Sequence, residues 1–180
     1  MTDDFKISTP SPFGCIQTNR LVLRIPRLDD SADVFAIHGN PETNRHNPAG
    51  PMKDLVEAKE RITGWIRDWA DDGIGYWRVT ELDGAQVIGV SGVRVMEWSG
   101  RQVLNLYYRY GPAAWGKGYA TEVASEAIEV AQEYFPELPV IARTRPTNLS
   151  SMKVAERVGL VRRLDLDTNE HVVFASWWRT

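Results

Sequence analysis

Apolar residues recur along the chain at two spacings, and the spacing separates expected helices from expected strands. Between Lys53 and Asp71 they fall every three or four positions, and Asp72-Gly73 ends the run, which predicts a helix. Residues Gly118 to Phe135 and Asn148 to Val158 show the same spacing. A helix is also expected from Asp29 to Gly39, because aspartate is a favoured residue at a helix start. The pattern therefore predicts about four helices.

Runs rich in β-branched and aromatic residues, separated by turn residues, predict about seven strands. They are residues 21–25, 76–81, 86–97, 103–110, 140–144, 160–166 and 172–177. Asp83-Gly84 and Ser99-Gly100 are typical of hairpins, so three consecutive strands are expected to be antiparallel. The succession of strand, helix and strand from residue 103 to 144 indicates a parallel crossover. We therefore expect an α/β protein of the α+β type with a mixed, mostly antiparallel sheet.

Composition limits the function classes. The 180 residues are 43% hydrophobic and 25% charged, which suits one domain at residues 16–180 after an irregular N-terminal arm at 1–15. The net charge of −3 argues against a nucleic-acid partner. One cysteine and three scattered histidines offer no metal-ligand spacing, so no metal is expected. The acidic N-terminus and the lack of a long apolar run make the cytoplasm the default location, without membrane association.

Glycines gather at the start of the predicted helix at 118–135, in the segment Trp115-Gly116-Lys117-Gly118-Tyr119. Glycines let backbone N–H groups approach an anion, and the first turn of a helix carries free N–H groups, so the segment predicts a phosphate site. Read from Gly111, it matches the nucleotide-binding pattern G-x-x-x-x-G-K. That pattern then needs a Ser or Thr for Mg²⁺, and this chain has Gly118 there. Nucleotide hydrolysis is therefore disfavoured, and a simple tight turn with a solvated Lys117 is the plain alternative.

Three separated blocks give the glycine segment a more specific meaning. Trp115 to Ala120 resembles the acyl-CoA pyrophosphate loop of the GNAT superfamily of N-acetyltransferases, with Gly118 and Ala120 on its small positions. With tryptophan at its first position, the loop resembles that of one branch of the superfamily, the ribosomal-protein N-terminal acetyltransferases (RimJ/RimL type). Asn148 to Leu160 resembles the Asn-x-x-Ser helix of that branch, and Thr18 to Arg24 resembles its opening Thr-x-Arg-Leu-x-Leu-Arg strand.

The resemblance implies a GNAT fold in which the strands at 104–110 and 140–144 splay apart to receive the pantetheine arm of acetyl-CoA, with no metal. Lys117 would attract phosphate or lie in solvent, Asn148 would cap its helix and also reach the CoA arm, and Ser151 would either bond the CoA sulfur or only cap the helix. The residues that the resemblance assigns to CoA binding are Tyr108, Arg109, Tyr110, Trp115, Gly116, Lys117, Gly118, Tyr119, Ala120, Thr121, Asn148 and Ser151.

The same resemblance places Ser151, Asn105 and Tyr108 at the catalytic centre. Relatives of this branch commonly carry glutamate at the position of Asn105, and asparagine cannot act as a base. An α-amine, with a pKa near 8, is about 10 to 20% neutral at pH 7, so it tolerates a missing base better than a lysine side chain does. Replacement bases are His46 and Glu97 on the substrate side, and Tyr108. Glu97, just before Trp98-Ser99-Gly100, is better explained as a solvated turn residue.

The leading hypothesis is an acetyl-CoA-dependent N-acetyltransferase, in which a primary amine attacks the thioester directly. The acceptor would be a protein N-terminal α-amine or a small-molecule amine, and the protein a monomer or homodimer. The alternative is a catalytically impaired CoA-binding protein of the same fold, which the asparagine at position 105 favours. An interaction domain that binds no CoA ranks third.

Overall fold

The structure is a computed structural model that describes residues 11–178, and these residues form one sheet with helices on both faces. The strands are β1 (Cys15–Gln17), β2 (Leu21–Arg24), β3 (Tyr76–Glu81), β4 (Gly89–Trp98), β5 (Arg101–Tyr110), β6 (Val140–Thr144), β7 (Val161–Arg162) and β8 (Val172–Ala175). The helices are α1 (Ser31–His38), α2 (Leu55–Asp72), α3 (Tyr119–Tyr134) and α4 (Leu149–Arg157), with 3-10 turns at Leu28–Asp30, Glu42–Asn44 and Pro112–Ala114.

The sheet has the strand order β1-β2-β3-β4-β5-β6-β8-β7, and only β5 and β6 pair in parallel. The expected antiparallel β3-β4-β5 unit and the parallel crossover through α3 are confirmed. Eight strands are present among residues 11–178 where about seven were expected, because Cys15–Gln17 pairs with β2. The predicted strand at 160–166 shortens to β7, because the chain turns after Arg163, where the Leu166 N–H bonds to the Arg163 carbonyl at 3.0 Å.

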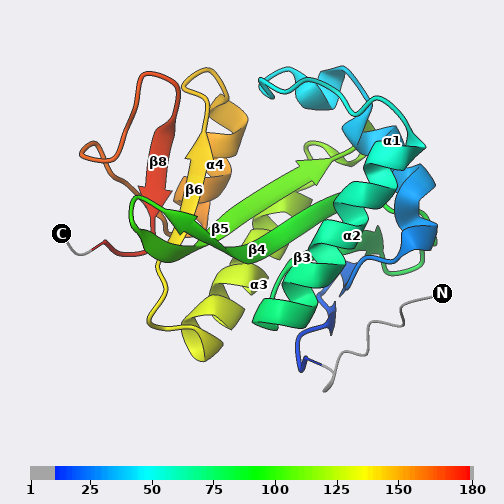
Figure 1. Cartoon of the computed structure of the whole chain (residues 1–180), viewed down its shortest axis with the longest axis horizontal. Helices are drawn as coiled ribbons and strands as arrows, with labels where there is room; N and C mark the ends of the chain where they lie inside the picture. The colour runs from blue at the N-terminus through cyan, green and yellow to red at the C-terminus, as the bar shows by residue number, and fades with distance from the viewer. Residues whose placement is uncertain (1–10, 179–180) are drawn as a thin grey trace.

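Two layers of helix cover the sheet. α3 and α4 pack on one face, where Val123, Ala127 and Ala155 join the main core with Leu104 and Leu106 of β5. α1 and α2 pack on the other face around a second core. Figure 1 shows α2 in front of the sheet and α3 behind it. Successive β5 side chains therefore enter different layers, as strand geometry requires.

Strands β5 and β6 pair at only two positions, Leu104 with Val140 and Asn105 with Ile141. Beyond them the strands diverge, as Figure 1 shows, whereas β5 stays paired with β4 as far as Tyr110. The expected splay between residues 104–110 and 140–144 is thus present. It leaves one edge of β5 without a strand partner along residues 106–110.

The expected irregular arm at 1–15 lies partly outside the described residues, and one residue of its described part, Phe13, packs into the core. Phe13 is buried against Trp69 and Phe135. Its carbonyl accepts a hydrogen bond from Trp77 Nε1 at 2.8 Å. The packed part of the domain therefore includes residues that precede the expected boundary at residue 16.

Candidate functional site

The open edge of β5 offers hydrogen-bonding groups to an extended ligand. The N–H of Leu104 bonds to the Pro139 carbonyl at 2.9 Å, so it points toward β6. Strand alternation turns the backbone groups of Leu106 and Tyr108 the same way, into the wedge where β6 has diverged. Unpaired groups on a strand edge accept an extended ligand by main-chain hydrogen bonding.

The glycine segment at the end of β5 presents backbone amides at the start of α3. Gly116 and Gly118 have φ of +74° and +80°, and Gly118 caps α3 without a side-chain hydrogen bond. A Cβ at Gly116 would meet no atom within 4 Å, so the backbone conformation, not crowding, calls for glycine there. The amides of the first turn therefore remain available to an anion, favoured by the helix dipole.

The block at Thr18–Arg24 braces this segment. Arg20 donates from Nη1 to the Lys117 carbonyl at 2.8 Å and from Nε to Glu122 at 2.7 Å, and Thr18 donates to Glu122 at 2.6 Å. Burial raises the pKa of Glu122, but the bonds from Thr18 and Arg20 outweigh it and lower that pKa below its usual value. A charged carboxylate thus ties the first turn of α3 to the β1–β2 turn.

The structure directs several residues of the segment toward the protein. The Lys117 ammonium lies 3.3 Å from Glu81, which also accepts from the Tyr119 hydroxyl at 2.7 Å. Trp115 donates from Nε1 to the Tyr110 carbonyl at 2.8 Å and so covers the end of β5. The Lys117 ammonium is thus drawn toward Glu81 and keeps two further N–H donors.

The start of α4 faces β5 across the wedge. Asn148 caps α4 through Oδ1, which accepts from the Ser151 N–H at 3.1 Å. The Tyr108 hydroxyl donates to the Ser151 carbonyl at 2.7 Å and lies 3.0 Å from Ser151 Oγ. Burial raises the pKa of Tyr108 to about 12, against the opposing effect of its bond with Ser151. Tyr108 is therefore protonated at neutral pH and is not a base there.

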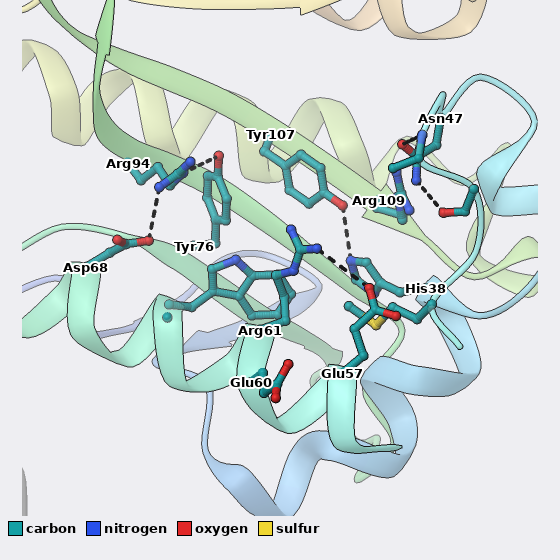
Figure 2. A pocket seen from close by; sticks show the side chains of 15 residues that line it. His38, Asn47, Glu57, Glu60, Arg61, Asp68, Tyr76, Arg94, Tyr107 and Arg109 are labelled. Atoms are coloured by element: carbon teal, nitrogen blue, oxygen red, sulfur yellow. Dashed lines mark hydrogen bonds and ion pairs between the residues drawn. The ribbon is translucent and has the colours of Figure 1, made fainter. Parts of the chain in front are cut away.

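A cavity of about 680 Å³ lies on the other face of β5, beneath α2 and the chain that joins α1 to α2. Figure 2 shows its charged side chains converging from α2 and from the strands. They are Glu57, Glu60, Arg61, Asp68, Arg94 and Arg109. Since Arg109 lines this cavity, its side chain points away from the face that carries Tyr108 and Tyr110.

Tyr76 stands at the centre of a polar network in this cavity. Its hydroxyl oxygen accepts from Asn105 Nδ2 at 2.7 Å and from Arg94 Nε at 3.3 Å, and Arg94 pairs with Asp68 at 3.6 Å. Burial raises the pKa of Asp68, and the charge of Arg94 opposes that rise. Asn105 is therefore a hydrogen-bond donor to Tyr76, and Asp68 is a carboxylate that the sequence did not single out.

His38, at the end of α1, is held neutral. Its Nδ1 lies 3.1 Å from the Val34 carbonyl, which only accepts, so Nδ1 carries the proton and Nε2 accepts from the Tyr107 hydroxyl at 3.1 Å. Burial, followed by the charge of Arg109, lowers the pKa of His38 to about 3. Burial also raises the pKa of Tyr107 to about 12. Neither group is a general base near neutral pH.

The buried His38 gives the protein a defined acid sensitivity. The unfolded chain binds a proton at His38 below about pH 6.5, whereas the folded protein does so only near pH 3. Between these values the unfolded state binds more protons, so the free energy of unfolding decreases as the pH is lowered, by on the order of 1 kcal/mol per pH unit. The variant His38→Gln stays neutral and keeps an acceptor for Tyr107. It is expected to lose the part of the pH dependence of stability that His38 contributes. Urea unfolding at about pH 5 and about pH 7.5 measures it, and an equal acid-induced loss in both proteins would contradict the assignment.

The two residues expected on the substrate side, His46 and Glu97, lie in different parts of the structure. His46 lies in the chain between α1 and α2, and its Nδ1 is 3.3 Å from Thr147 Oγ1 at the β6–α4 connection. Glu97 is exposed near the β4–β5 turn and does not line the cavity. Trp69 lies in the core, whereas Trp65 both packs in the core and lines the cavity.

Sequence reasoning missed His38, Asp68 and Tyr107. On α2 a signal existed, because Glu57, Arg61, Gly64 and Asp68 follow the helical spacing of the apolar stripe and lie beside it. Within residues 11–178, no three or more His, Cys, Asp or Glu side chains come together in a way that could hold a metal ion. Within the same range, no helix has the length and apolar character needed to cross a membrane.

Comparison with known proteins gives consistent matches. Residues 20–161 match the family described as acetyltransferase (GNAT) domain. The uncharacterized N-acetyltransferase p20 of Bacillus licheniformis is 25% identical over 154 residues, covering 82% of this chain and 85% of that protein. The uncharacterized protein YkkB of Bacillus subtilis is 24% identical over 143 residues, or 79% and 83% of the two chains.

Solved structures share the fold. The acetyltransferase from Agrobacterium tumefaciens superposes with a TM-score of 0.76 at 22% identity, over 89% of this chain and 92% of its own. RimL, a ribosomal L7/L12 alpha-N-protein acetyltransferase in complex with coenzyme A, has a TM-score of 0.72 at 15% identity, over 89% and 96%.

Proposed function

This chain belongs to the GNAT acetyltransferase family, and on that premise we propose that it moves an acetyl group from acetyl-CoA to a primary amine by direct attack on the thioester. The family supports an acyltransferase that uses acetyl-CoA. The observation that carries the proposal is the open edge of β5. This edge leads to the glycine segment before α3, and the charged cavity lies on the face of β5 that α2 covers.

The residues of the wedge suit the CoA moiety. The pantetheine arm, which is extended and carries amides, matches the free backbone groups of Leu106 and Tyr108. The amides of residues 116–121, at the positive end of α3, suit its pyrophosphate. A Cβ at Gly118 would have one neighbour within 4 Å, Arg20 Nη2 at 3.6 Å, so the space before the segment is open for a ligand.

The same backbone suits the chemistry of acyl transfer. Attack by an amine puts negative charge on the thioester oxygen, and an N–H of β5 that points into the wedge would stabilise it. The departing thiolate needs a proton. We assign this role to the Ser151 hydroxyl, which lies 3.0 Å from the Tyr108 hydroxyl where β5 faces α4. The nitrogen of the attacking amine releases one proton as the amide forms, and this proton restores the serine, so the reaction has no net proton change.

The amine acceptor would enter through the cavity on the α2 face. Tyr76, Tyr107 and Tyr108 all have raised pKa values because they are buried, and His38 is held neutral, so none of these groups removes a proton near pH 7. The remaining candidate bases that line the cavity, within residues 11–178, are the carboxylates of Glu57, Glu60 and Asp68. An acceptor that is already neutral, such as an α-amine, suits this arrangement best.

Release of CoA thiol from acetyl-CoA tests the proposal, measured with a panel of peptides and small amines. Amine-dependent release, together with acetylated acceptor detected by mass spectrometry, is the expected result. Calorimetric binding of acetyl-CoA without release on any amine would favour the catalytically impaired CoA-binding protein. A lack of acetyl-CoA binding would contradict both functions.

Ser151→Ala is expected to lower kcat by roughly tenfold or more, because the thiolate loses its proton donor, while the KM for acetyl-CoA changes little. Ser150→Ala is the matched control, since the Ser150 hydroxyl is exposed and bonds only to Asn148 Oδ1 among the described contacts. Steady-state kinetics on both variants measures the difference. Equal kcat values in the wild type and Ser151→Ala would reject the role of Ser151 as proton donor and leave it only a structural role at the start of α4.

A further inference from the structure

The three arginines of the cavity differ in their partners. Arg61 pairs with Glu57 at 3.8 Å, and Arg94 pairs with Asp68 at 3.6 Å. Arg109 has no carboxylate within ion-pair distance among residues 11–178, and its Nη1 donates to the neutral Asn44 Oδ1 at 2.7 Å. A half-buried guanidinium without a counter-charge is thus part of the cavity wall.

This guanidinium is held in place. Asn44 is buried, and its Nδ2 donates to the carbonyls of His38 and Asn40 at 2.7 and 2.8 Å, which fixes Oδ1 toward Arg109. The Arg109 guanidinium carbon also lies 5.8 Å from the centre of the Tyr107 ring. A positioned arginine loses less entropy when it binds an anion, and its planar fork matches the two oxygens of a carboxylate.

The two walls of the cavity differ in net charge. The α2 wall carries three carboxylates, Glu57, Glu60 and Asp68, and one arginine, Arg61, so its net charge is negative. Arg94 and Arg109 come from the strands, as Figure 2 shows, and Glu60 is the carboxylate of this wall without an ion pair among residues 11–178. A molecule with a cationic amine and an anionic group would therefore find a complementary charge for each. The volume of about 680 Å³ lies within the range of pockets that bind small molecules.

We propose that Arg109 binds a carboxylate of the amine acceptor, so that the acceptor is an amino-acid-like molecule or a peptide whose N-terminus lies close to an acidic group. This inference rests on the proposed acetyl transfer and specifies its acceptor. It also gives the Arg109 side chain a role in acceptor binding, separate from any contact of the β5 backbone with CoA.

Matched acceptors that differ only in charge test the proposal. One arm compares a free amino acid with its carboxamide, and the other compares peptide amides that begin Ser-Glu with those that begin Ser-Gln. In at least one arm the carboxylate acceptor is expected to show a kcat/KM at least tenfold higher, mainly through KM. The arm that shows the preference identifies the source of the carboxylate.

Arg109→Gln is expected to remove this preference and leave the affinity for acetyl-CoA unchanged, while Arg109→Lys keeps part of it. Arg67→Gln, an exposed arginine on α2 outside the cavity, is the control. Circular dichroism confirms that each variant folds. A preference that persists in Arg109→Gln, or equal use of charged and neutral acceptors by the wild type, would overturn the proposal. A loss of acetyl-CoA affinity with an unchanged acceptor preference would do so too, because it would assign Arg109 to a CoA phosphate.

Direct binding separates this proposal from the proposed reaction. Calorimetry of the same acceptor pairs with the protein, without acetyl-CoA, needs no turnover. Tighter binding of the carboxylate member, lost in Arg109→Gln, would support the carboxylate site even if no acetyl transfer occurred. Equal binding of both members alongside active acetyl transfer would reject the site and leave the reaction intact.

Discussion

Gly118→Glu is expected to weaken acetyl-CoA binding by about a hundredfold, equivalent to about 3 kcal/mol. Gly118 has a φ of +80°, which costs other residues roughly 1 kcal/mol or more. The added side chain would start 3.6 Å from Arg20 Nη2, at the N-terminus of α3, so its carboxylate would compete with the pyrophosphate for the positive charge there and repel it. Calorimetric titration with acetyl-CoA measures the change.

Two variants separate charge from backbone strain in this experiment. Gly118→Ala introduces the strain without the charge and is expected to weaken binding less. Gly73→Glu introduces the same side chain at a φ of +70° after α2, where a Cβ meets no atom within 4 Å. It is expected to bind acetyl-CoA as the wild type does. An unchanged affinity in Gly118→Glu would reject the glycine segment as the pyrophosphate site.

The rate of acetyl transfer is expected to rise about fiftyfold between pH 6 and pH 8 with an α-amine acceptor whose pKa is near 8. The reactive species is the neutral amine, whose fraction grows nearly tenfold per pH unit below that pKa and then levels off. Asn105 donates to Tyr76 and cannot remove a proton, and the buried tyrosines titrate too high to help. The pH dependence of kcat/KM measures the effect.

Acceptors of different basicity show which group is titrating. The midpoint is expected to move with the pKa of the acceptor amine. A midpoint common to all acceptors and lying well below their pKa values would reveal a base on the protein. Asp68 is then the residue to examine, because burial raises its pKa and it lines the cavity, and Asp68→Asn would abolish that midpoint.

Local signals were sufficient for much of the fold. The predicted strands at 76–81 and 140–144 agree with β3 and β6, because their apolar runs end at turn residues. Asn148 was expected to cap a helix, and its side chain does so. The opening Thr18–Arg24 block was known only as a resemblance. The structure adds its physical reason, since Arg20 binds Lys117 and Glu122 about a hundred positions later.

The acceptor side could not be predicted in the same way, because it depends on contacts between distant segments. His38 meets Tyr107 only once α1 packs on β5, and their spacing in the chain carries no pattern. Arg109 follows Tyr108 in the sequence, yet alternation along β5 sends its side chain to the opposite face. Glu97 and His46 were chosen by position in the chain, and neither lines the cavity.

A crystal structure of the protein with bound CoA tests the central claim most directly. We expect the pantetheine arm along the open edge of β5 at residues 106–110, the pyrophosphate on the amides of residues 116–121, and the sulfur near Ser151. The cavity lined by Tyr76 and Arg109 should remain free for the acceptor. CoA bound in that cavity, or away from the wedge between β5 and β6, would contradict the assignment.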